Sequence, residues 1–495
     1  MKENKEFPIS FKSYRIFHFM WCFFILVHHT ITAGDWTKIG NNFLQSGNYF
    51  FLGLCVFLPF VIILSVLNPR KPLIFAAGLL IWSGIKFGNM PFIPNHIILA
   101  LIVNLCTISG ILYMYFWKKS GNLEENIGQM YKIVAPVLRW LVIILYFFTV
   151  FHKLNHSYFD PTVSCGVALY GEITKILPFL PNNELVAWIT IYGTLIIETL
   201  IPVLLLILGY RLFAIITGLA FHFLLAIHPN LMIFSFTTEI YALYTLFLPI
   251  KTVKDIHITI TNILRKLMFL NQKDKIKLSI ALLIPAGVLI LWIYKTNPVP
   301  AVPPNYLQFI IFGLYAWCSF LILLTLRYIF KTKIEDRLHT RQLLNIPAPA
   351  FIFFIFLTVF NGITPYLGLK TATNFSMFSN LKVAGEKSNH LIIAETLPLL
   401  QYNNDFVEIE DSDYPPFIHI KEKHELVTLF EIEREVQNYD SEEPKNLTYS
   451  YRKKTYKVQL PKDQNLPQFN RISWMEKKFL VYRDVPKSGP CPCQW

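Results

Sequence analysis

Long apolar segments recur along the first 363 residues of the chain and constrain its fold more than any other feature. A helix needs about 20 mainly apolar residues to cross the hydrocarbon core of a bilayer. Eleven segments meet this requirement or come close to it, and we expect each to form a membrane-spanning helix. They are residues 16–33, 50–67, 72–86, 92–117, 135–151, 185–208, 211–228, 231–249, 277–294, 307–329 and 346–363. The predicted fold class is therefore an all-α polytopic membrane protein with about eleven transmembrane helices.

The loops between these segments differ in their content of basic residues. With the N-terminus in the cytoplasm, the cytoplasmic loops hold 21 Lys and Arg residues and the outer loops hold 5. Basic residues gather in the cytoplasmic loops of membrane proteins. We therefore expect an N-in, C-out protein of the cell (inner) membrane, with the lipid bilayer as its first partner. Few acidic residues and many Lys, Ile and Asn residues favour a bacterial source. The net charge of +13 reflects these loops and does not predict nucleic-acid binding.

The composition changes after the last apolar segment. The whole chain is only 16% charged, whereas soluble domains carry about 25% charged residues. Residues 371–495 alone hold 16 basic and 18 acidic side chains. Apolar–polar alternation and short apolar runs predict strands at 391–393, 406–409, 455–460 and 479–482, and the pattern of 424–437 predicts one helix. We expect a membrane domain in 1–330, a cytoplasmic loop with the last span in 331–363, and a small extracytoplasmic α+β domain in 364–495. A loosely ordered tail is the alternative for this last part.

Ionisable side chains within or at the ends of the apolar segments are costly and are therefore functional candidates. Lys153 ends the fifth segment, and His222 lies about two thirds of the way along the seventh. At 1.5 Å per residue, His222 lies roughly 9 Å below the outer end of its segment, so both residues can face one outward-opening cavity. A lysine at this position can instead snorkel to the interface. The candidate pocket is completed by Glu198, His28, His152, Asn155 and His156.

Two of these candidates also have other interpretations. A carboxylate near mid-membrane needs a partner, a proton or water. Glu198 is therefore as compatible with a structural contact between two helices as with a functional role. His152 and His156 have the spacing of a metal pair on a helix, but the sequence places no acidic residue close to them. A haem or copper protein remains an alternative that would draw on His28, His29, His152, His156, His222 and His228.

The seven cysteines give no zinc-type spacing. Cys491-Pro-Cys493 is compatible with a redox or metal role and with an unreactive tail. We therefore expect no bound metal.

Several motifs follow one another in an order that resembles a known family. Lys153-Leu154-Asn155 lies in FFTVFHKLNHSYFDP (147–161), His222 follows on a later apolar segment, and Phe234-Ser235-Phe236 precedes an aromatic-rich stretch. This arrangement resembles the HTTM (horizontally transferred transmembrane) domain, the membrane domain of vitamin-K-dependent γ-carboxylase and its bacterial relatives. The resemblance is best over 135–250, and residues 361–381 are similar to the post-membrane segment of bacterial members.

The resemblance implies a site and a chemistry. In the carboxylase, the family lysine deprotonates vitamin K hydroquinone, O2 converts the hydroquinone to a strong base, that base removes a proton from glutamate, and CO2 traps the carbanion. By this resemblance Lys153 is the base, and His222 polarises the quinone oxygens. The implied cofactors are a reduced quinone, O2 and CO2, and the implied substrate is a secreted peptide or a small molecule. Asn155 stands where the family's Lys-Leu-Asp form has a carboxylate.

Two function classes follow from these observations. The first is a quinol-linked oxidase or carboxylase at an outward-facing pocket, with Lys153 as its base. The second is a non-enzymatic membrane protein, such as an export or maturation helper, a transporter or an immunity partner, in which the polar groups are structural or conduct protons. Replacing Lys153 by Arg discriminates between them, since Arg keeps its proton and can only substitute for a snorkelling cation.

Overall fold

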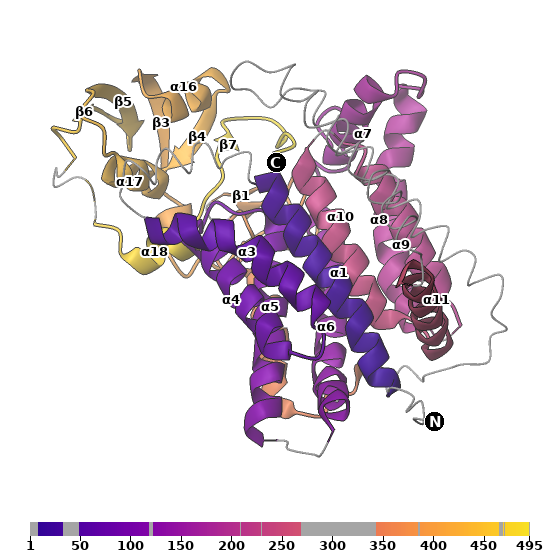
Figure 1. Cartoon of the computed structure of the whole chain (residues 1–495). Coiled ribbons are helices and arrows are strands. Elements are labelled where there is room, and N and C mark those ends of the chain that lie inside the picture. The colour runs from indigo at the N-terminus through magenta and orange to yellow at the C-terminus, as the bar shows by residue number, and fades with distance from the viewer. Residues whose placement is uncertain are drawn as a thin grey trace, which may run out of the picture.

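The structure is a computed structural model that describes residues 8–32, 49–117, 122–207, 209–228, 230–268, 343–384, 387–464, 469 and 471–494. It is mostly helical, and the strands of the described residues lie in the C-terminal part of the chain (Figure 1). The helices are α1 (Ile9–Thr32), α3 (Tyr49–Leu67), α4 (Pro72–Gly88), α5 (Asn95–Trp117), α6 (Leu123–Lys153), α7 (Cys165–Ile176), α8 (Glu184–Leu206), α9 (Arg211–Leu225), α10 (Leu231–Tyr244), α11 (Ile250–Met268), α15 (Ile352–Ile363), α16 (Pro415–Glu422), α17 (Leu429–Asn438) and α18 (Trp474–Phe479).

Three of the described helices are long and apolar enough to cross a membrane, namely α5, α6 and α8. A fourth span arises if α10 and α11 are counted together, although the chain bends by 115° between them. Four shorter apolar helices, α3, α4, α9 and α15, accompany them. The expectation of membrane helices is therefore confirmed for part of the chain, whereas the number of eleven and the orientation remain predictions.

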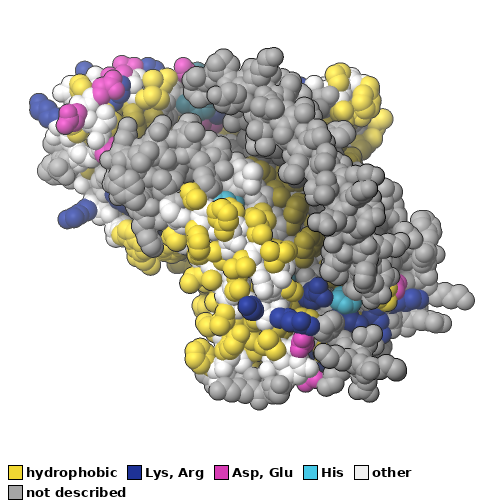
Figure 2. Space-filling view, in the orientation of Figure 1, with side chains coloured by type: hydrophobic (Ala, Val, Ile, Leu, Met, Phe, Trp, Pro, Cys, Tyr) yellow, Lys and Arg dark blue, Asp and Glu magenta, His cyan; other side chains and the backbone are white. Residues whose placement is uncertain are grey.

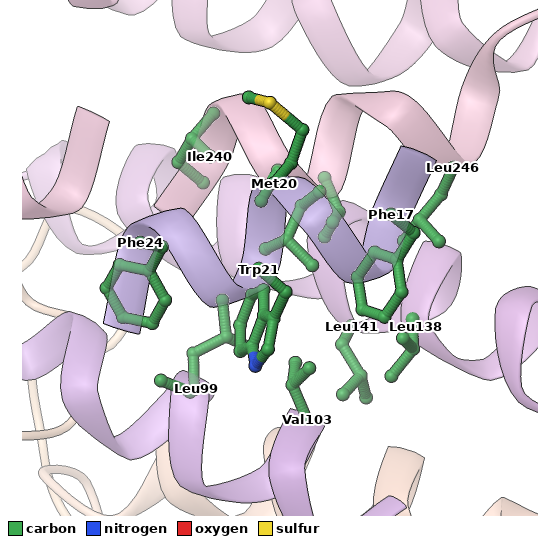
Figure 3. Close-up of a cluster of buried hydrophobic side chains, with 14 of the residues drawn as sticks. Phe17, Met20, Trp21, Phe24, Leu99, Val103, Leu138, Leu141, Ile240 and Leu246 are labelled. Carbon is green, nitrogen blue, oxygen red and sulfur yellow. The ribbon is translucent and has the colours of Figure 1, made fainter. Parts of the chain in front are cut away.

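Helix α1 forms the centre of the helical part. It packs against α10, α6 and α3, and its aromatic side chains Phe17, Trp21 and Phe24 are almost completely buried. Figure 3 shows these side chains among Leu99 and Val103 of α5 and Leu138 and Leu141 of α6. The indole Nε1 of Trp21 donates a 2.8 Å hydrogen bond to the side chain of Asn104. Aromatic burial together with a satisfied polar atom gives this centre a defined packing.

The outer faces of the helices are apolar, which is the opposite of a soluble protein. Helix α3 exposes Phe57, Phe60 and Leu67 at 59%, 65% and 72%, and α8 exposes Ile189 and Ile196 at more than half of their area. Figure 2 shows this apolar surface on the helical part, with charged side chains gathered on the sheet and at the opposite end of the helices. Large contiguous apolar surfaces of this kind are typical of contact with lipid or with a partner.

The C-terminal part contains a five-stranded antiparallel sheet. Its order is β6-β5-β3-β4-β7, and a separate hairpin pairs β1 with β2. The strands are β1 (Val383–Ala384), β2 (Lys387–Ser388), β3 (Phe406–Ser412), β4 (Glu425–Thr428), β5 (Lys445–Tyr451), β6 (Lys454–Leu460) and β7 (Val485–Pro486). Inward-facing Val407, Val427 and Tyr449 pack against Phe417 of α16 and Ile432 of α17. The expected small α+β unit and its strands at 406–409 and 455–460 are therefore confirmed.

Three local predictions in this part are wrong. Residues 391–393 form no strand because the ring of His390 accepts the main-chain N–H groups of Ile392 and Ile393, at 3.1 Å each. Residues 479–482 form none because α18 ends at Phe479 and the Glu431 carboxylate takes the N–H of Tyr482 at 2.7 Å. Side chains therefore take the main-chain N–H groups that would otherwise donate to a neighbouring strand.

The third wrong prediction is the single helix at 424–437, which divides into β4 and α17. Thr428 caps α17, with its hydroxyl accepting the N–H of Glu431, and the residues before it pair with β3. An N-cap threonine marks the first residue outside a helix, so the helix cannot include 425–428.

The remaining span predictions divide into two groups. Segments 277–294 and 307–329 lie outside the described residues. The segment expected at 346–363 is a short 3-10 turn, Pro349–Phe351, followed by the twelve residues of α15, and the loop expected at 250–277 begins with α11. Helix α11 carries Lys251, Lys254 and Asp255 close to its start, and these charges led to its prediction as a loop.

A disulfide between Cys165 and Cys493 attaches the end of the chain to the first turn of α7. The neighbouring Cys491 keeps a buried free thiol, and its main-chain N–H donates to the Ser157 hydroxyl at 3.0 Å. Burial raises the pKa of the Cys491 thiol to about 11, so this thiol stays protonated at neutral pH. The tail is therefore held against the loop that follows α6.

Candidate functional site

Lys153 is the last residue of α6, and its side chain turns back along the helix instead of reaching solvent. Its ammonium donates to the carbonyl of Thr149, one turn earlier, at 3.3 Å. It also donates to both carboxylate oxygens of Glu198, at 2.7 and 3.1 Å. The side chain of Lys153 is 4% exposed and that of Glu198 is 11% exposed. Lys153 is thus half of a buried ion pair.

Glu198 is the other half of this ion pair. It lies in the middle of α8, which packs directly against α6, and bulk water reaches little of either charge. Two charges taken out of water are stable only as a close, hydrogen-bonded pair. The carboxylate stabilises the protonated lysine, and a proton shift within the pair gives an amine beside a carboxylic acid with no change in total charge.

His222 belongs to a second cluster that joins three helices. Its Nε2 shares a 2.8 Å hydrogen bond with the hydroxyl of Tyr146 on α6. Tyr146 also hydrogen-bonds to the hydroxyl of Tyr244, the last residue of α10. All three side chains are buried, and the Phe236 ring packs edge-on against the imidazole at 5.2 Å. The result is a chain of exchangeable protons from Tyr244 to His222.

Gly218 makes room for this chain on α9. A Cβ at this position would overlap the Tyr244 ring and its hydroxyl. The absent side chain therefore lets α10 approach α9 closely enough for Tyr244 to reach Tyr146.

The two clusters are neighbours. Helix α6 carries a member of each cluster, because Tyr146 and Lys153 lie seven residues, about two turns, apart on one face of it. We call these five residues, Lys153, Glu198, Tyr146, His222 and Tyr244, the Lys153 site. It combines a buried ion pair with a hydrogen-bonded Tyr–Tyr–His chain, an arrangement that can accept, hold and pass on a proton.

Lys153, His222 and Glu198 are expected from the sequence, whereas Tyr146 and Tyr244 are not. A signal for Tyr146 was present, because it lies seven residues before Lys153 on one helix and thus on the same face. Tyr244 carried no such signal, since its place depends on how α10 packs. The pairing of Lys153 with Glu198 likewise depends on the packing of α6 on α8.

Other expected pocket residues lie elsewhere. His152 donates through Nε2 to the carbonyl of Gly362 at 3.0 Å, so it faces the end of α15. Asn155 donates to the carbonyls of His152 and Ser379, and its Oδ1 accepts the N–H of Tyr158. Both residues fix the turn after α6 to the post-membrane segment. His156 is exposed, and the structure does not bring it to the Lys153 site.

His28 belongs to a third polar cluster. Its Nδ1 shares a 2.7 Å hydrogen bond with the Ser235 hydroxyl, which also bonds to His96 at 3.1 Å. Phe236 follows Ser235 and contacts both His96 and His222, so this cluster borders the Lys153 site through one ring. Within the described ranges, no three His, Cys, Asp or Glu side chains converge in a way that could hold a metal ion.

Comparison with protein-family models, with curated proteins and with solved structures gives no match for this chain.

Proposed function

We propose that this chain is a membrane enzyme in which the Lys153–Glu198 pair accepts a proton from a reduced lipid quinone, in a reaction like that of the vitamin-K-dependent γ-carboxylases that its motifs resemble. One observation carries the proposal: a lysine at the end of an apolar helix is buried against a carboxylate, and the same helix carries a tyrosine that hydrogen-bonds to both a buried histidine and a second tyrosine. Proton transfer needs groups that can exchange protons away from bulk water, and this cluster contains five of them.

The residues of the site fit a quinol. Among the described residues, His222 Nδ1 is buried without a hydrogen-bond partner. A buried polar atom of this kind normally has a partner, so a ligand hydroxyl or carbonyl would satisfy it. A bound quinol would supply two electrons to O2.

The residues of the chain would divide the work of proton transfer. The pair in its resting form is an ammonium beside a carboxylate and has no net charge. A shift of the ammonium proton to Glu198 frees the Lys153 amine, which takes up the quinol proton. The pair is then an ammonium beside a carboxylic acid, with a net charge of +1 that stabilises an anion next to it. His222, held by Tyr146, would orient the oxygen that loses the proton. Arg at position 153 would keep the charge but could not release its own proton.

We further propose that the C-terminal part lies outside the cytoplasm, with eleven spans in an N-in, C-out arrangement. The Cys165–Cys493 disulfide supports this orientation, because structural disulfides persist in oxidising compartments. A peptide or small-molecule substrate would then reach the site from the extracytoplasmic face, while the quinone arrives through the bilayer.

The test uses the purified full chain in lipid nanodiscs with menaquinol and O2, followed by oxygen uptake and by mass spectrometry of the quinone products. We expect quinol-dependent oxygen uptake with formation of an oxidised quinone or its epoxide. Lys153→Ala and Lys153→Arg should both abolish it. The matched control is Lys175→Arg, because Lys175 forms an exposed pair with Glu172 on α7. Oxygen uptake that persists in Lys153→Arg would refute proton transfer by the Lys153–Glu198 pair. It would favour a purely structural role for the positive charge at position 153.

A further inference from the structure

A pocket of about 470 Å³ lies where the helices meet the C-terminal part, and the proposed proton chemistry does not use it. Its walls come from four stretches that are far apart in the chain: the α4–α5 connection with the start of α5, the start of α10, the segment after α15, and the C-terminal tail. Pockets of roughly 300–1,000 Å³ are the usual size of small-molecule sites.

The lining is mostly apolar, with Phe92, Met232, Phe236 and Met377 among its residues. Its polar residues include Arg483 and Gln494, both from the tail. None of the seventeen described residues that line the pocket is acidic. A molecule that fits this lining has an apolar body and an anionic end.

Arg483 is the cation that an anion would meet. Its main-chain N–H donates to the Thr371 hydroxyl at 2.7 Å, which fixes its backbone without using the guanidinium. Partial burial lowers the pKa of Arg483, and no carboxylate among the described residues forms an ion pair with it. A bound anion would give this guanidinium the charge-assisted partner that no described carboxylate supplies.

A second cation, Lys370, also favours an anionic ligand. The buried ammonium of Lys370 donates to the carbonyl of Thr373, a lining residue, at 3.1 Å. Burial lowers the pKa of Lys370 to about 8, so most of it is charged at neutral pH.

The two acids near the tail do not cancel this charge. The Gln494 amide donates to the carbonyl of Asp484 at 2.9 Å and to the Glu425 carboxylate at 3.5 Å. Burial and the nearby Glu425 raise the pKa of Asp484 to about 7. Asp484 therefore carries only part of its negative charge near neutral pH, and neither acid lines the pocket.

We propose that this pocket binds an amphipathic anion, an apolar chain ending in a carboxylate or a phosphate group, with Arg483 binding the anionic end. The disulfide at Cys493 holds Gln494, the next residue, in the wall, so the tail is part of the site. This inference does not depend on Lys153 acting as a base.

The test is photolabelling of the full chain in nanodiscs of neutral phosphatidylcholine, with a fatty acid that carries a diazirine at its chain end. Peptide mapping should find the label within 91–96, 230–236 or 372–378. Decanoate and decyl phosphate should compete for the site, and their relative strength distinguishes a carboxylate from a phosphate. Decanol tests the need for charge and inorganic phosphate tests the need for the chain, and both should compete at least about tenfold less well.

Arg483→Gln should weaken competition by decanoate about tenfold or more, whereas Arg483→Lys should keep part of it, because a charge-assisted hydrogen bond contributes roughly that much. Lys487→Gln is the matched control, because this neighbouring lysine pairs with Glu408 on the surface. Size-exclusion profiles check that the variants fold. Equal competition by decanol and decanoate, unchanged competition in Arg483→Gln, or label only on the lipid-facing helices would overturn the proposal. None of these readouts requires quinol turnover.

Discussion

The buried pair between Lys153 and Glu198 makes a quantitative prediction about stability. At 2.7 Å and an effective dielectric constant of about 20, the attraction between the two charges is about 6 kcal/mol. Most of that attraction only offsets the loss of water around both ions. Removing one partner leaves the other charge buried and alone, which typically costs about 3–5 kcal/mol, whereas removing both costs much less.

A double-mutant cycle measures this difference. Lys153→Met and Glu198→Gln should each lower the free energy of unfolding by about 3–5 kcal/mol, and the double variant should be no less stable than either single one. The free energy is measured by SDS titration of the chain in mixed micelles, followed by tryptophan fluorescence. The exposed Lys175–Glu172 pair serves as the control, with an expected coupling below about 1 kcal/mol. Additive losses in the Lys153–Glu198 cycle would refute the ion pair.

Three further predictions concern packing, pH and the tail. Gly218→Ala should push Tyr244 away and lower the free energy of unfolding by about 1–3 kcal/mol. Gly193→Ala, in open space on α8, should not lower it. The same SDS titration compares the two variants, and equal effects would contradict the packing argument. Because the pKa of Asp484 is raised in the folded chain, its protonation stabilises the fold at low pH, and this contribution is lost as the pH rises through about 7. The Asp484→Asn variant should therefore show a smaller loss of stability in unfolding scans from pH 5 to 8. Cys165→Ser should abolish the mobility difference between reduced and non-reduced gels, and a remaining difference would assign the disulfide elsewhere.

Some of the site could be predicted from the sequence because helical periodicity fixes depth. Lys153 and His222 were placed at compatible depths from segment boundaries alone, and α6 carries both Lys153 and Tyr146, whose hydroxyl bonds to His222. The partner of Lys153 could not be predicted, since Glu198 is 45 residues away on another helix and the pair forms only when α8 packs on α6. Contacts between helices depend on which faces meet, and hydropathy carries little information about that.

The C-terminal part shows a different limit. Its strands at 406–409 and 455–460 were predictable from alternation, because each buries one face against α16 or α17. Residues 391–393 look equally strand-like, but the His390 ring takes two of their N–H groups. The Cys165–Cys493 disulfide spans 328 residues, and no spacing rule singles out that pair among seven cysteines.

The most direct test of the account is to observe the proton arriving at the Lys153 site. Infrared difference spectra of the chain in nanodiscs are recorded without oxygen, before and after adding menaquinol. The account predicts a new carboxylic-acid band that is absent in Glu198→Gln and in Lys153→Ala and is unchanged in the Lys175→Arg control. A spectrum without that band, or a band that persists in Glu198→Gln, would contradict the claim that this buried pair takes the proton.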